Sequence, residues 1–113
     1  MITKREALEK TAAMWRWLSQ DGRREKSDYP GLREEEHYPI NECYCCQYAE
    51  EHNAGSDPCM SCPLSSLWPI YCINCTSPYA EWSEARNRNE FDNAEKYALE
   101  IALAAEEELG KLL

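Results

Sequence analysis

The sequence is poor in the residues that build a large hydrophobic core. It contains no valine and one phenylalanine, and leucine, isoleucine, valine and phenylalanine together make 16 of its 113 residues. This share lies under the roughly 20% below which disorder becomes a serious alternative. A chain of this length also buries only about 65% of its unfolded surface. We therefore predict one domain, residues 1–113, whose fold needs a source of stability besides apolar burial.

Signals for secretion, membrane insertion and phosphate binding are missing as well. Residues 1–18 carry six charges, so they lack the apolar centre of a signal peptide. No stretch approaches the ~20 apolar residues of a membrane span, and the four glycines are scattered rather than grouped in a phosphate loop. The cysteine count of seven is odd, whereas a secreted disulfide framework has an even number. We expect a cytoplasmic protein with reduced thiols and no membrane contact.

The most specific feature present is a set of three Cys-x-x-Cys pairs within 33 residues. The short turn in such a pair points two thiolates at one metal ion, and two pairs complete a tetrahedral zinc site. Zinc also supplies folding free energy, ~10–16 kcal/mol in small zinc peptides. The sequence thus predicts a Zn²⁺-binding segment over residues 43–75, with ligands drawn from Cys43, Cys46, Cys59, Cys62, Cys72 and Cys75.

The number of zinc ions stays open. We favour one site with four cysteines from the first two pairs, because the twelve residues between those pairs are typical of zinc ribbons and knuckles. A second ion would need help from His37 or His52. Cys45 lies between two predicted ligands and is the cysteine left over. The third pair could instead be small buried side chains.

Catalytic patterns are incomplete. Residues 58–62 match the Pro-Cys-x-x-Cys half of the zinc deaminase signature, but neither His37 nor His52 begins the His-x-Glu half. That half supplies a zinc ligand and the general acid–base glutamate. A redox Cys-x-x-Cys would need a βαβ frame, which the sequence does not predict. We therefore predict no enzymatic activity; a metalloenzyme would require an open coordination position.

Two helical regions flank the cysteines. Thr3 and Glu6 form a capping-box pattern, apolar residues follow at helical spacing, and Gly22 suits the position after the helix end, which predicts a helix over about 4–20. Residues 23–42 look irregular, with a turn at Pro30-Gly31. A short helical turn is expected over 46–51.

The C-terminal region, residues 78–112, carries the longest helical pattern. Ser77-Pro78 resembles an N-cap followed by proline at the first helical position. The region could be one helix or two, with a break at Asn87-Arg88-Asn89. Its apolar stripe consists of Phe91, Ala94, Tyr97/Ala98, Ile101, Ala105, Leu109 and Leu112.

The net charge of −9 is unevenly distributed. Residues 1–26 carry +3 and the remainder carries −12. An acidic surface attracts a basic partner and repels phosphate backbones, which makes nucleic acid an unlikely ligand. We expect the partner-binding face on the C-terminal helix, at Glu95, Glu100, Glu106, Glu107 and Glu108.

The alternative is a zinc-dependent nucleic-acid binder that uses the basic N-terminal helix. In that hypothesis Trp17 stacks on bases. The opposing interpretation is that these basic side chains pair with the acidic C-terminal helix. They are Arg5, Lys10, Arg16, Arg23, Arg24 and Lys26.

The order of features resembles a group of small cysteine-rich proteins encoded by bacteriophages of Gram-positive bacteria. The likeness rests on Trp15-x-Trp17, on Cys43–Ala49, on Cys59–Leu64, on Trp68-Pro69 and on Tyr79-x-x-Trp82. It covers about residues 5–105 at low density. Cys45 and Cys75 are additions to the pattern. The resemblance implies a phage product acting in host cytoplasm and supplies no reaction.

Together these observations predict a mainly α-helical protein, with N- and C-terminal helices packed around a zinc-knuckle loop region and little or no sheet. The predicted function is non-enzymatic: a zinc-stabilised, acidic protein-binding module that inhibits or modulates a host or defence protein. Its oligomeric state does not follow from the sequence.

Overall fold

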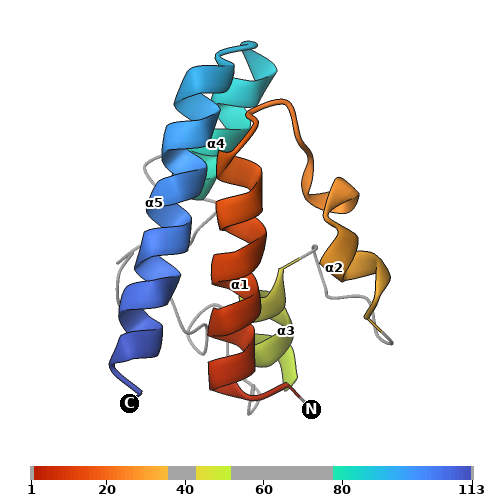
Figure 1. Cartoon of the computed structure of the whole chain (residues 1–113), viewed down its shortest axis with the longest axis vertical. Coiled ribbons are helices and arrows are strands. Elements are labelled where there is room, and N and C mark those ends of the chain that lie inside the picture. The colour runs from red at the N-terminus through yellow and green to blue at the C-terminus, as the bar shows by residue number, and fades with distance from the viewer. Residues whose placement is uncertain (1, 36–42, 52–77, 113) are drawn as a thin grey trace.

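The computed structural model describes residues 2–35, 43–51 and 78–112, and every element in these ranges is helical, with no strand among them (Figure 1). The expectation of a mainly helical fold is confirmed for this part of the chain. Most of the cysteine-rich segment lies outside it. The elements are α1 (Lys4–Ser19), η1 (Lys26–Asp28), α2 (Pro30–Arg33), α3 (Tyr44–Glu51), α4 (Pro78–Asn87) and α5 (Phe91–Gly110).

Helix α1 begins at the cap that the sequence predicts. The backbone N–H of Glu6 donates to Thr3 Oγ1 at 3.1 Å, which satisfies one of the donors left over at a helix start. The Glu6 carboxylate accepts from the Thr3 hydroxyl at 3.2 Å. The helix ends at Ser19, one residue before the expected end.

Gly22 has a different role from the expected helix-ending one. The C-cap of α1 is Gln20, and Gly22 lies buried against the start of α5. A Cβ at Gly22 would overlap the carbonyl oxygen of Phe91 and lie 2.7 Å from its carbonyl carbon. The Gly22 N–H donates to a Glu95 carboxylate oxygen at 2.9 Å. Glycine is required here because two backbones approach closely, which local sequence does not reveal.

Helices α1 and α5 lie side by side and antiparallel, as Figure 1 shows, and their contact is the largest between described elements. The predicted packing of the N- and C-terminal helices is thereby confirmed. Helix α5 contributes a seam of fully or nearly fully buried small residues around Ile101. Helix α1 contributes larger buried side chains: Leu8, Met14, Trp15 and Leu18 against Ala94, Ala98, Ala102 and Ala105.

Helix α4 completes the core with aromatic contacts. The rings of Trp15 and Trp82 meet edge to face with centroids 4.8 Å apart, and Tyr79 lies 6.0 Å from each of them. Edge-to-face aromatic pairs contribute about 0.5–1.5 kcal/mol beyond their buried area. These rings therefore tie α4 to α1 in a chain that has few aliphatic side chains.

The break between α4 and α5 falls where the sequence places it, at residues 87–89. Asn89 has φ = 60°. Its N–H bonds the Arg86 carbonyl at 3.0 Å, and the Glu90 N–H bonds the Ala85 carbonyl at 2.8 Å. These two bonds define a Schellman motif, in which asparagine is among the few non-glycine residues that tolerate the left-handed position. The chain therefore reverses here and α4 packs along α5.

The intervening segments are more helical than expected. Helix α3 begins at Tyr44, two residues before the predicted turn, and packs on α1. The prediction of irregular structure after residue 22 is wrong at Lys26–Asp28 and at Pro30–Arg33, where η1 and α2 form. Pro30 starts α2 because its fixed φ suits the first helical turn.

No helix in the described part of the chain combines the length and the hydropathy needed to cross a membrane.

A pair of matched glycine substitutions tests the close approach of Gly22 to Phe91. Gly22→Ala should lower the free energy of unfolding by about 1–3 kcal/mol, because the new methyl group overlaps backbone atoms. Gly110→Ala, in the last turn of α5 with no atom within 4 Å of the new Cβ, should be neutral or raise it by about 0.5–1 kcal/mol. Urea unfolding measures both; equal effects would contradict the contact.

Candidate functional site

The structure describes part of the predicted metal segment. Cys43 is half-buried next to α3, and Cys45 and Cys46 lie in its first turn. The other four predicted ligands and both histidines, His37 and His52, lie outside the described residues. Within residues 2–35, 43–51 and 78–112, no three His, Cys, Asp or Glu side chains converge on a point that could hold a metal ion. The zinc site therefore stays a prediction.

Cys45, the cysteine left over in the sequence, is a core residue. It is 1% exposed and packs between α1 and α3 with Leu8, Ala12 and Ala105. Its Sγ lies 3.2 Å from Thr11 Oγ1, which is also buried. Cysteine often serves as a small hydrophobic residue with a weak hydrogen-bonding group, which explains a thiol between two predicted ligands.

Cysteine substitutions separate packing from metal binding. Cys45→Ala should keep the zinc content of the purified protein while costing about 1 kcal/mol of stability, because a buried sulfur is lost. Cys43→Ser should lower the zinc content, because it removes a predicted thiolate ligand. Metal analysis with urea unfolding measures both effects. The ligand assignment fails if Cys45→Ala loses zinc and Cys43→Ser retains it.

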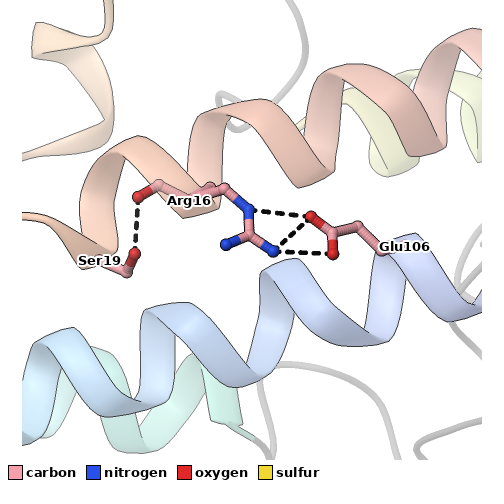
Figure 2. Close-up of polar contacts among 3 residues, drawn as sticks. All are labelled: Arg16, Ser19 and Glu106. Carbon is pink, nitrogen blue, oxygen red and sulfur yellow. Dashed lines mark hydrogen bonds and ion pairs between the residues drawn. The ribbon is translucent and has the colours of Figure 1, made fainter.

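The five glutamates of the predicted partner face divide into two groups. Glu95 accepts the Gly22 N–H, and Glu108 is 8% exposed with an oxygen 3.1 Å from Lys111 Nζ. Glu106 binds the Arg16 guanidinium through three contacts of 2.6–2.9 Å (Figure 2). Glu100 and Glu107 are exposed. Three of the five carboxylates thus serve contacts within the molecule.

The Arg16–Glu106 pair is the clearest case of a basic residue of α1 binding the acidic helix. Its side chains are 47% and 40% exposed, so solvent screens the pair. Figure 2 shows the guanidinium bridging the two helices, while the Ser19 hydroxyl donates to the Arg16 carbonyl at 2.6 Å. The bidentate geometry fixes the register of α1 on α5 more than it adds stability.

A charge swap tests this pair. Arg16→Glu should destabilise the protein by about 1 kcal/mol, because it replaces attraction with repulsion at a partly exposed site. The double variant Arg16→Glu/Glu106→Arg should recover most of that loss. Thermal unfolding at low and high salt measures both. A double variant no more stable than the single one would show that the two side chains do not interact.

The outer face of α5 carries two exposed leucines that the sequence analysis did not single out. Leu99 is 37% exposed and Leu103 is 49% exposed, and they lie one turn apart. Glu100 follows Leu99, Glu107 lies one turn after Leu103, and the exposed Lys96 lies one turn before Leu99 and Glu100. Neither leucine belongs to the apolar stripe that predicted the core. A leucine outside that stripe is expected to face solvent, so the sequence pattern could have identified the pair.

A pocket of about 480 Å³ opens between α4 and α5. Sequence reasoning missed it, because its existence depends on how α4 and α5 pack after the turn at Asn89. Small alanines and the Tyr97 ring border it together with three carboxylates and one guanidinium. The lining residues are Ala80, Glu81, Glu84, Ala85, Arg88, Glu90, Asn93 and Tyr97.

The basic N-terminal side chains are engaged within the molecule. Arg24 lies 4.4 Å from the Trp17 ring centroid and donates to the Trp17 carbonyl at 2.7 Å, so its guanidinium covers one ring face. Lys26 is buried over the Tyr79 ring. The remaining partners are Glu9 for Arg5, Glu35 for Lys10, Glu106 for Arg16 and the Phe91 ring for Arg23.

Tyr29 contacts the edge of Trp17 on the same side of the molecule. Burial raises the pKa of Tyr29 above its usual value, and the negative charges of Glu34 and Glu35 raise it further.

Comparison of the chain with protein-family models, with curated proteins and with solved structures finds no match. Function is therefore inferred from the contacts and charges of this chain.

Proposed function

We propose that the protein is a non-enzymatic protein-binding module that meets its partner through the outer face of α5. The observation that carries the proposal is the exposure of Leu99 and Leu103, one turn apart between carboxylates. Single exposed leucines are common, but this chain has few aliphatic residues and places two of them together in solvent. Helix faces of this kind bind partners through side chains at spacings of three and four.

Charge gives the chemistry of the partner. The chain has a net charge of −9, so a second copy of itself is repelled, as is a phosphate backbone. Glu100 and Glu107 beside the leucines favour a partner surface that combines apolar and basic residues. Proteins that handle nucleic acids carry such surfaces. We therefore propose inhibition or modulation of a host or defence protein of that kind, in the host cytoplasm, consistent with the resemblance to phage products.

Zinc has a structural role in this proposal. Cysteines of residues 43–75 hold Zn²⁺ in a zinc-knuckle loop region with all coordination positions filled by thiolates, and the ion takes part in no reaction. Helix α3, which carries Cys46, packs on α1, and α1 packs on α5. Metal binding would thus stabilise the helix that presents the leucines without contacting the partner.

The nucleic-acid alternative has weaker support. It needs accessible cations and an open tryptophan face, whereas Arg16, Arg24 and Lys26 bind groups of the protein itself. Arg24 also covers one face of Trp17.

A comparative pull-down tests the proposed face. Immobilised wild-type protein should capture a specific protein from a lysate of a Gram-positive bacterium. Leu99→Gln/Leu103→Gln should reduce the captured amount by about tenfold, because the two leucines supply the apolar centre of the contact. Leu112→Gln is the matched control, since Leu112 is 41% exposed but lies beyond Gly110, the last residue of α5.

The readout is quantitative mass spectrometry after nuclease treatment. Capture that survives the double substitution, or that nuclease treatment abolishes, would contradict the proposed face. The second outcome would favour the nucleic-acid alternative.

A further inference from the structure

The pocket between α4 and α5 adjoins the outer face of α5. Successive residues of a helix are 100° apart, so Asn93 and Tyr97 on the pocket wall lie within about 60° of Glu100 around the helix axis. Glu100 is exposed on the face that carries the leucines. By the same arithmetic Asn93 lies about 80° from Leu103 and about 120° from Leu99, so a partner that covers the leucines reaches the pocket only by extending further around α5.

We infer that this pocket receives the guanidinium group of an arginine side chain from the basic partner. The inference rests on the proposed function and specifies what one part of the partner must present. The reasons are the charge, the free hydrogen-bonding capacity and the shape of the pocket.

The charge of the lining is negative, with three carboxylates against one guanidinium. Glu81 and Glu84 come from α4, and Glu90 precedes the first residue of α5. Arg88 Nη2 lies 2.9 Å from Glu84 Oε1, and the two side chains are 65% and 56% exposed. A pair so open to solvent is weak, so it yields readily to a better-placed cation.

Two polar groups of the lining have unused hydrogen-bonding capacity. Glu81 is half-buried and makes no hydrogen bond or ion pair with the described part of the chain, and the same holds for the Tyr97 hydroxyl. Glu90 accepts only a long bond, 3.4 Å, from Asn93 Nδ2. Glu81 alone of the three carboxylates is half-buried, since Glu84 and Glu90 are exposed. A half-buried carboxylate loses hydration without regaining it from the protein, and a cationic donor restores what it loses.

The shape favours a planar organic cation over a metal ion. Ala80 and Ala85 contribute small side chains to the lining, and the carboxylates are spread around a volume of about 480 Å³ instead of converging. None of the described acidic groups is arranged to ligate a metal. A guanidinium group can bind carboxylates in bidentate fashion and also lie against a tyrosine ring.

The experiment uses N-acetyl-L-arginine amide as the probe and follows backbone amide shifts of the full-length, metal-replete protein by NMR. The neutral isostere N-acetyl-L-citrulline amide is the ligand control. We expect saturable shifts at residues 80–97 with the arginine probe and none with citrulline. Glu81→Gln/Glu90→Gln should weaken probe binding about fivefold, because two partly exposed charge contacts are lost.

Glu9→Gln is the matched protein control, because Glu9 is an exposed glutamate on α1 remote from the pocket. It should bind the probe like the wild-type protein. Equal shifts with citrulline, shifts produced by Ca²⁺ but not by arginine, or unaltered binding by the double glutamine variant would each overturn the inference.

The pull-down separates this inference from the proposed function. If captured protein depends on Leu99 and Leu103 but not on Glu81 and Glu90, the face is a docking surface and the arginine pocket is refuted. If the arginine probe binds the pocket but the captured amount is unchanged by the substitution of Leu99 and Leu103, the pocket is a cation site and the proposed face is wrong.

Discussion

The contact between α1 and α5 is the interaction on which the rest of the structure depends. It joins the two ends of the described chain through a seam where Ala98 and Ala102 are fully buried. Small residues let the helix axes approach, so the larger side chains of Trp15 and Leu18 fill the space from the other side. Helix α3 packs on α1 and α4 packs on α5, so each depends on this contact for its position.

This seam shows how the chain forms a core although it has few large aliphatic residues. The sequence suggested that metal binding replaces part of the missing core. Zinc binding stays a prediction, whereas the described helices show a solution of their own, which combines close alanine packing with the ring cluster of Trp15, Tyr79 and Trp82. Alanine loses no side-chain entropy on burial and favours the helix, so α5 gains stability from residues that contribute little apolar area. Some of the few aliphatic residues therefore lie outside the core, as Leu99 and Leu103 do.

Local signals predicted α1, α5 and the turn before α5, but not η1 or α2. Thr3 marks the start of α1, and residues 87–89 mark the turn between α4 and α5, because capping and reversal depend on neighbouring residues. Features set by distant contacts were not predictable. Gly22 looked like a helix terminator but is required by Phe91, and Glu108 looked like part of an acidic face but is buried.

The same limit applies to the candidate site. An acidic helix could be recognised from its composition, but which carboxylates remain available depends on where Arg16 and Gly22 lie in three dimensions. The pocket beside α5 depends on how two helices pack after Asn89, which no periodicity encodes. Predictions based on charge therefore singled out α5 without distinguishing its structural carboxylates from its exposed ones.

The most direct test of the close packing of α1 on α5 compares the free energies of unfolding in urea of two variants that carry the same substitution, alanine to leucine. Ala98→Leu places a larger side chain in the seam, where Ala98 is 0% exposed, and Ala13→Leu places the same side chain on the exposed side of α1. The account predicts a loss of about 1–3 kcal/mol for Ala98→Leu and a change within about 0.5 kcal/mol for Ala13→Leu. Equal stability of the two variants would contradict a fold organised by the close packing of α1 on α5.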